Sequence, residues 1–381
     1  MCDYPCSKPI IEKKFRPLTL LLLDCWQREY DKRPYRNFKF ERIKFEERLE
    51  RNYDSKQDFT TIVLFLKKRS LYSIKLVGLT LHQQPVRIIY DFVEGLQKLK
   101  RIELKLMELP LEFFQILDYN AELMKLKELS LEGTALTDKD ILCLHSFIIK
   151  SKTLQILNIS CCSINQYNFA LLADAIYKSP TLNSCNMSHL LGLHLTLDSQ
   201  KIAHIIATLI WQNKLQELIL ENCGLLGHDM EILAEYLYDI SSKLQSLNVS
   251  FNKIGSNGAL ELFKAISKSK TLKNLKMTGC SLGSHGGEIV AQYLSSCWNL
   301  ESLALQYNTI SAEVINMILL CMKKPCKLMK LYLYGGNRFN TRTGDILRRL
   351  LESGVLPQDF IDITVTFDDT LPGYRVIPWL P

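Results

Sequence analysis

The chain has 381 residues, of which 47% are hydrophobic and 23% are charged, and its formal net charge is +7. This composition is close to that of an average soluble globular protein and excludes wholesale disorder. The longest purely aliphatic run, Leu20 to Leu23, is far shorter than the roughly 20 residues that a membrane-spanning helix needs. We therefore expect a cytoplasmic protein without a membrane contact. Because the positive charge is spread along the chain, no nucleic-acid partner is expected either.

Residues 1 to 56 follow no repeat, and we expect a helical segment there. Asp24, Cys25 and Trp26 are followed, after six intervening residues, by Arg33 and Pro34. This spacing resembles the end of a protein-kinase C-lobe, where the Arg pairs with a buried glutamate and the Trp packs late helices. The chain contains no glycine-rich phosphate loop, H-R-D or D-F-G motif, so the resemblance implies at most a kinase remnant whose residues have lost their partners. A coincidental amphipathic helix is the alternative.

The stretch from Lys32 to Arg51 mixes basic residues with three phenylalanines. Such a mixture could contact RNA or an acidic membrane, but four glutamates dilute its charge, so we expect a solvated helix. Residues 57–70 follow, and the apolar pattern from Phe59 to Leu66 predicts a capping helix at the N-terminal end of the repeats.

Residues 71–355 repeat one spacing, with Leu or a similar residue at positions 1, 4, 6 and 11 and Asn, Cys or Thr at position 9 of most copies. Successive copies are separated by 28, 27, 28, 28, 33, 29, 28, 28 and 28 residues. The ten copies begin at Leu71, Leu99, Leu126, Leu154, Leu182, Leu215, Leu244, Leu272, Leu300 and Leu328. Alternation at positions 4 and 6 predicts a short strand, and the second half of each copy has helical spacing.

One such unit cannot bury its own apolar side, so neighbouring units must stack into a shared core. Because helices are wider than the spacing between strands, about 4.8 Å, the stack must curve, with parallel strands on the concave side and helices on the convex side. The sequence therefore predicts an α/β solenoid with a horseshoe shape. The unit resembles the leucine-rich repeats of the ribonuclease-inhibitor class over about Leu71 to Phe367. This resemblance implies a protein that binds partners on its concave face.

Two departures from the period predict irregular structure. The copy at Leu182 takes 33 residues to reach the next one, so we expect a bulge or loop around His189 to Asp198. Residues 356–381 are expected to form a C-terminal cap, in which Phe360 to Phe367 makes a last strand before a Pro-rich tail.

Polar or thiol side chains at the ninth position are expected to point inward and to hydrogen-bond loop backbone that would otherwise be unpaired in the core. We expect reduced, structural cysteines at these positions. The residues concerned are Thr134, Cys162, Cys223, Asn252, Cys280 and Asn308.

Outward residues of successive strands line up about 5 Å apart, which makes the concave face the best candidate for a binding surface. The residues that we predict to contact a protein partner are Glu217, Glu221, Phe251, Gln306, Tyr307, Lys330, Tyr332 and Tyr334. The four aromatic residues among them form the expected main patch, because Tyr and Phe bury much area at low entropic cost. The alternative is that these rings only pack on one another and shield the end of the sheet.

No catalytic, metal or cofactor site stands out. Cys185, His189 and His194 lack the paired spacing of a zinc module. The cysteine pairs Cys161 and Cys162, and Cys321 and Cys326, have no nearby histidine in sequence that would make a nucleophile credible. We therefore expect a non-catalytic scaffold or adaptor. The alternatives are a substrate-recognition subunit of a ubiquitin ligase, which would need an F-box-like segment before the repeats, a GTPase-activating protein, and a regulatory kinase remnant.

Overall fold

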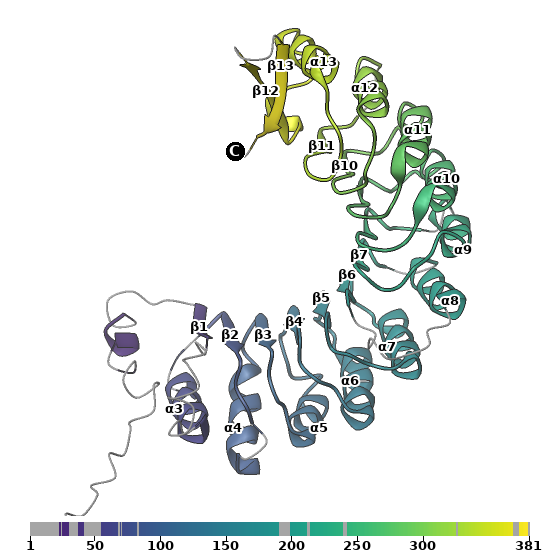
Figure 1. Cartoon of the computed structure of the whole chain (residues 1–381). Coiled ribbons are helices and arrows are strands. Elements are labelled where there is room, and N and C mark those ends of the chain that lie inside the picture. Colours follow the sequence, from purple (N-terminus) through teal and green to yellow (C-terminus); the bar gives the residue numbers. More distant parts are fainter. Residues whose placement is uncertain are drawn as a thin grey trace, which may run out of the picture.

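The structure is a computed structural model in which β-strands and α-helices alternate along an arc (Figure 1). It describes residues 23, 25–29, 37–41, 55–67, 69, 71–81, 84–189, 199–211, 214–238, 242–324, 327–368 and 373–379.

One parallel sheet of 11 strands, hydrogen-bonded in chain order, lines the inner side of the described part of the arc. Its strands are β1 (Asn37–Glu41), β2 (Ser73–Val77), β3 (Arg101–Lys105), β4 (Glu128–Ser130), β5 (Ile156–Asn158), β6 (Ser184–Asn186), β7 (Glu217–Ile219), β8 (Ser246–Asn248), β9 (Asn274–Lys276), β10 (Ser302–Ala304) and β11 (Lys330–Tyr332).

Helices follow the strands and form the outer side of the arc (Figure 1). They are α3 (Ser55–Lys67), α4 (Val86–Leu96), α5 (Leu111–Tyr119), α6 (Asp138–Lys150), α7 (Gln166–Lys178), α8 (Ser199–Ile210), α9 (Asp229–Leu237), α10 (Gly255–Ile266), α11 (Gly283–Leu294), α12 (Ala312–Cys321) and α13 (Thr341–Glu352).

The core lies between the sheet and the helices, and its side chains stand in equal register. Leu247, Leu275, Leu303 and Leu331 are direct neighbours in successive strands, and each is fully buried. Burying one such leucine contributes about 1.5 to 3 kcal/mol, so each unit depends on its neighbours for stability. The predicted α/β solenoid, with a parallel concave sheet and convex helices, is confirmed.

The ninth-position side chains join each loop to the preceding repeat. The Asn252 amide donates to the carbonyls of Leu220 and Val249, both at 2.8 Å, and its Oδ1 accepts the backbone N–H groups of Cys223 at 2.9 Å and Leu225 at 3.1 Å. Asn308 repeats this arrangement two repeats further along the chain, where its Oδ1 accepts the backbone N–H of Cys280 at 2.8 Å.

Thiols and a hydroxyl replace the amide at other ninth positions. Cys162, Cys223 and Cys280 donate through Sγ to backbone carbonyls of the preceding repeat at 3.3, 3.3 and 3.2 Å. The hydroxyl of Thr134 donates to the Leu104 carbonyl at 3.2 Å. In the last repeat Asn337 donates equivalent hydrogen bonds to backbone carbonyls. This repeat has one extra residue, so Asn337 lies one position later than the regular spacing would place it.

The N-terminal part contains a strand where the sequence predicts a helix. The expectation of a helix from Lys32 to Arg51 is wrong at Asn37–Glu41, which forms β1 and pairs in parallel with β2. The reason is a period of two: Phe38 and Phe40 point inward and are each 3% exposed. Helix α3 follows β1 and packs beside α4. The predicted helix from Phe59 to Leu66 is thus part of α3, which is the convex helix of an additional unit.

Trp26 has packing partners in this unit. Its ring lies 5.0 Å from that of Phe38, 5.9 Å from that of Phe40 and 5.6 Å from that of Phe65. The edge of the repeat sheet thus supplies this tryptophan with aromatic contacts, and the interpretation as a kinase remnant stays a prediction. Asp24, Arg33 and Pro34 lie outside the described residues.

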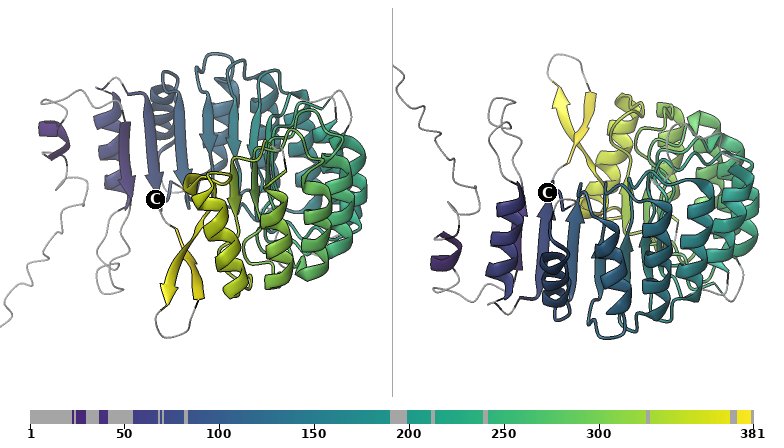
Figure 2. Two further views of the ribbon diagram at one scale, coloured as in Figure 1. Left: turned by 90° about the horizontal axis from the view of Figure 1, so that it is seen from above. Right: turned by 90° about the horizontal axis from the view of Figure 1, so that it is seen from below.

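The C-terminal end also differs from the expected single closing strand. A short 3-10 helix, η1 (Gln358–Phe360), precedes β12 (Ile363–Asp368), which pairs in antiparallel fashion with β13 (Gly373–Pro378) in a separate sheet. The tail is therefore the second strand of a hairpin. Figure 2 shows this hairpin beside α13, where the Arg348 guanidinium lies 4.8 Å from the ring centre of Tyr374.

Most of the loop that we expect around His189 to Asp198 lies outside the described residues. His189 itself has a left-handed backbone with φ of 49°, and the chain is described again from Ser199, where α8 begins.

The hydrogen bonds of the ninth-position side chains, which we call the ladder, predict a large loss of stability when Asn252 is replaced by an apolar residue. Asn252→Ala leaves buried carbonyl and N–H groups of two repeats unpaired, so the free energy of unfolding should fall by about 3 kcal/mol. Asn252→Cys keeps a donor in the position that Cys223 and Cys280 occupy, and its loss should be about 1 kcal/mol smaller. Urea unfolding followed by circular dichroism measures both. Equal stability of the alanine variant and the parent protein would show that the ladder does not support the stack.

Candidate functional site

Two adjoining hollows lie on the concave face near the C-terminal end of the sheet. The first encloses about 580 Å³ and is lined by Glu221, Ser250, Phe251, Asn274, Lys276, Thr278, Glu301, Ser302, Ala304, Gln306, Met329, Lys330 and Tyr332. The second encloses about 500 Å³ and is lined by Gln306, Tyr307, Lys330, Tyr332, Tyr334, Asp359, Phe360, Ile361, Asp362, Pro378 and Trp379. Since Gln306, Lys330 and Tyr332 line both, the hollows form one surface, which we call the C-terminal groove.

Seven of the eight predicted partner-binding residues line this groove: Glu221, Phe251, Gln306, Tyr307, Lys330, Tyr332 and Tyr334. The eighth, Glu217, lies outside it on β7 and accepts a hydrogen bond from Ser184 Oγ at 2.7 Å.

The exposed aromatic rings of the groove are held from one side by glycines. Phe251 and Tyr307 occupy the eighth position of their repeats and have left-handed backbones, with φ of 59° and 55°. A Cβ atom built at Gly279 would lie 2.8 Å from the Phe251 ring, and one at Gly335 would lie 2.8 Å from the Tyr307 ring. Each ring thus covers the glycine of the next repeat, which leaves no room there for a side chain.

The same two rings remain open on their other side. Phe251 is 51% exposed and Tyr307 is 61% exposed. No ring contact joins Phe251, Tyr307, Tyr332 and Tyr334 to one another within the part of the chain that the structure describes. The rings therefore pack on backbone instead of on each other, and a large aromatic area faces the solvent in a fixed position.

Asp362 closes the far end of the groove and was not among the residues predicted from sequence. Its carboxylate accepts the backbone N–H groups of Leu333 at 2.7 Å and Tyr334 at 3.0 Å, and the Gln306 side-chain amide at 3.1 Å. The carboxylate thus takes the place that the carbonyls of another strand would occupy. Burial raises the pKa of the Asp362 carboxyl, while these three donors act in the opposite direction.

Sequence reasoning could not single out Asp362 because it lies just before β12, in a stretch that predicts a strand. Trp379 was missed for a similar reason, since it comes after the chain has folded back through the hairpin. Its N–H donates to the Asp362 carbonyl at 2.9 Å, which fixes the end of β13 beside the groove.

Most of the cysteine and histidine side chains that could have formed a catalytic or metal site are buried or hydrogen-bonded where the structure describes them. Burial raises the pKa of Cys162 and Cys280 to about 12, so these thiols stay protonated and unreactive at neutral pH. Burial also raises the pKa of Cys185. The ring of His189 is hydrogen-bonded to the Asn222 amide at 2.9 Å, and His194 lies outside the described residues. No group of three metal ligands occurs among the described residues.

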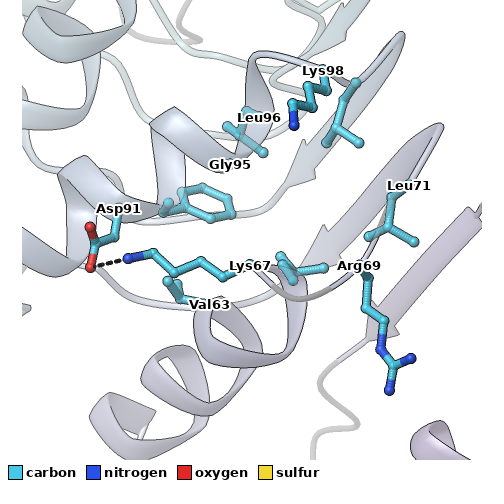
Figure 3. A pocket seen from close by; sticks show the side chains of 11 residues that line it. Val63, Lys67, Arg69, Leu71, Asp91, Gly95, Leu96 and Lys98 are labelled. Atoms are coloured by element: carbon cyan, nitrogen blue, oxygen red, sulfur yellow. Dashed lines mark ion pairs between the residues drawn. The ribbon is translucent and has the colours of Figure 1, made fainter.

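A third hollow, near the N-terminal end, is much smaller (Figure 3). It encloses about 30 Å³ between α3 and α4, and an ion pair joins Lys67 Nζ to Asp91 at 2.7 Å beside it. Apolar side chains such as Val63 and Leu96 line the remainder. Its size makes it a packing gap between helices and not a ligand site.

Comparison with known proteins agrees with this architecture. A family model described as a leucine-rich repeat matches residues 241–263, which contain β8 and most of α10. The chain is a leucine-rich-repeat solenoid. No helix in the described part of the solenoid is long and apolar enough to cross a bilayer.

Two relatives carry the same repeats in their names. NACHT, LRR and PYD domains-containing protein 5 of Homo sapiens is 27% identical over 212 residues, which are 55% of this chain and 17% of that protein. NACHT, LRR and PYD domains-containing protein 4C of Mus musculus is 26% identical over an alignment of 222 residues, and the match covers 51% of this chain and 22% of that protein. The solenoid therefore corresponds to less than a quarter of either relative.

One solved structure with a similar fold is the yeast complex of Rad7 and Elc1. Its matching chain is 19% identical with a TM-score of 0.49, and the match covers 81% of the solenoid and 75% of that chain.

The role of Asp362 can be tested by removing its carboxylate. Asp362→Ala leaves the N–H groups of Leu333 and Tyr334 without acceptors, so the free energy of unfolding should fall by about 2 kcal/mol. Amide hydrogen exchange at these two residues should become faster. Asp359→Ala, which removes an exposed carboxylate nearby, is the matched control and should change neither quantity. The same loss in both variants would contradict a capping role.

Proposed function

We propose that this solenoid is a non-catalytic scaffold or adaptor that binds protein partners in the C-terminal groove. The observation that carries the proposal is the pair of exposed rings, Phe251 and Tyr307, which are held in place by the glycines beneath them. A side chain that is already ordered loses little entropy on binding, and aromatic residues are frequent anchors of protein interfaces.

The shape of the groove supports a macromolecular partner. It crosses four neighbouring strands, β8 to β11, and reaches the hairpin β12–β13. At a strand spacing of about 4.8 Å, the strands alone span roughly 15 Å, which is long enough for several residues of an extended chain. The openness of the concave face along the arc also favours a protein segment over a small enclosed ligand (Figure 1).

The buried thiols support a role in the cytoplasm. Cys162, Cys223 and Cys280 are free and donate to backbone carbonyls, an arrangement that suits a reducing compartment. The period of about 28 residues supports a relationship to the ribonuclease-inhibitor class. The same groove could serve a substrate-recognition subunit of a ubiquitin ligase or a regulatory remnant of a kinase, but no feature of the described residues favours either.

Replacing two exposed aromatic residues tests the proposal. Tyr307→Ala combined with Tyr334→Ala should weaken partner binding about 30-fold, because an anchor at the centre of an interface contributes about 2 kcal/mol. The measurement is affinity capture of the tagged chain from cells with quantitative mass spectrometry, followed by titration of the purified partner.

The control variant combines Tyr119→Ala with Tyr167→Ala, which are 81% and 70% exposed and lie on the convex helices. It should retain the captured partners. Thermal unfolding checks that both double variants fold. Undiminished capture by a folded Tyr307/Tyr334 variant would remove the proposed site.

A further inference from the structure

Most charged side chains on the N-terminal half of the concave face are neutralised across neighbouring strands. Lys75 pairs with Glu103 at 3.7 Å, and Arg101 pairs with Glu128 at 2.6 Å. Lys105 pairs with Glu132 at 2.6 Å. In each pair the acidic residue belongs to the repeat that follows the basic one, so this part of the face offers little free charge to a ligand.

The C-terminal groove departs from this rule. Lys276 stands between Asn248 and Ala304 in the register of the sheet, and Lys330 stands beside Ser302. Neither register neighbour supplies a carboxylate. Both lysines are exposed, and neither side chain makes a hydrogen bond or ion pair with any described residue.

The carboxylates that line the first hollow are engaged elsewhere. Glu301 pairs with Lys273 at 3.1 Å, and Glu221 accepts a hydrogen bond from the Asn248 amide at 2.6 Å. Asp362 is occupied by backbone N–H groups, and Asp359 lines only the second hollow. The first hollow is therefore acidic on the side of β7 and basic on the side of β9 to β11.

From this charge pattern we infer that the C-terminal groove binds an extended acidic peptide, in which two carboxylates meet Lys276 and Lys330 while apolar side chains pack on Phe251 and Tyr332. The inference rests on the proposed function and names the chemistry of the partner. It predicts which residue types the partner presents and in what order.

Strand geometry sets the spacing of the two carboxylates. The lysines stand two strands apart and are offset by two residues in register, which separates their Cα atoms by about 12 Å. An extended chain advances about 3.3 Å per residue and alternates its side chains between two faces, so Asp or Glu residues four positions apart fit this distance on one face. The side chain midway between them points to the same face, toward the aromatic lining.

The same pattern argues against a nucleic acid. A phosphate backbone presents negative charge along its whole length, and Glu221 would repel it at one end of the hollow. A peptide can place its acidic residues beside the two lysines and a neutral or basic residue beside Glu221. Mixed charge therefore favours a peptide over a polyanion.

Selection from a displayed library tests the inference with the full chain. Random 12-residue peptides are selected on immobilised parent protein, on Lys276→Glu combined with Lys330→Glu, and on the control Lys270→Glu, which reverses an exposed lysine outside the groove. The parent and the control should enrich peptides with Asp or Glu four positions apart and flanking apolar residues. The doubly reversed variant should bind these peptides at least tenfold more weakly.

Each other outcome would overturn the inference in a recognisable way. Selected peptides without an excess of acidic residues, whose binding is lost in the Tyr307/Tyr334 variant, would leave the proposed function intact and remove the acidic preference. No selection by any folded protein would count against both. A fluorescent 20-nucleotide single strand that binds more tightly than the peptides, and depends on Lys276 and Lys330, would identify the surface as one for nucleic acid.

Discussion

Equal register of inward-pointing aliphatic side chains is the constraint on which this molecule depends. A leucine such as Leu303 touches its counterparts in both neighbouring strands, so no repeat has a core of its own. This dependence requires polar backbone to be carried into the interior at every loop, where water cannot solvate it. The ninth-position amides and thiols satisfy this buried backbone by donating hydrogen bonds to carbonyls of the preceding repeat. They thereby link neighbouring loops, just as the leucines link neighbouring strands.

The periodic part of the fold could be predicted because apolar spacing acts directly through burial. A period of two at Leu275 and Met277 and a helical spacing at Leu262 and Ile266 each place side chains on one face, and the structure buries all four. At β1 the same period was present in Phe38 and Phe40, but the surrounding charges favoured a helix. The strand forms because an open edge of the sheet is available, and edge availability is a tertiary property.

The C-terminal end shows the other limit of prediction. Phe360 to Phe367 has the composition of a strand, but composition does not say which strand it joins. The structure pairs β12 with β13, while Asp362 takes over the edge of β11. The groove is similar: outward positions follow from strand alternation, whereas the hairpin residues that complete it come from a change of chain direction. The assignment of these residues to partner binding stays a prediction.

The carboxylate at the edge of β11 has a consequence for solubility. A parallel sheet that ends with free backbone donors invites the edge of another molecule, and stacked repeats are well suited to extend one another indefinitely. A single charged side chain that already holds two of those donors makes the edge unattractive to a foreign strand, because a newcomer would have to displace a buried anion. The concave face can therefore stay open to ligands without an adhesive strand edge at β11.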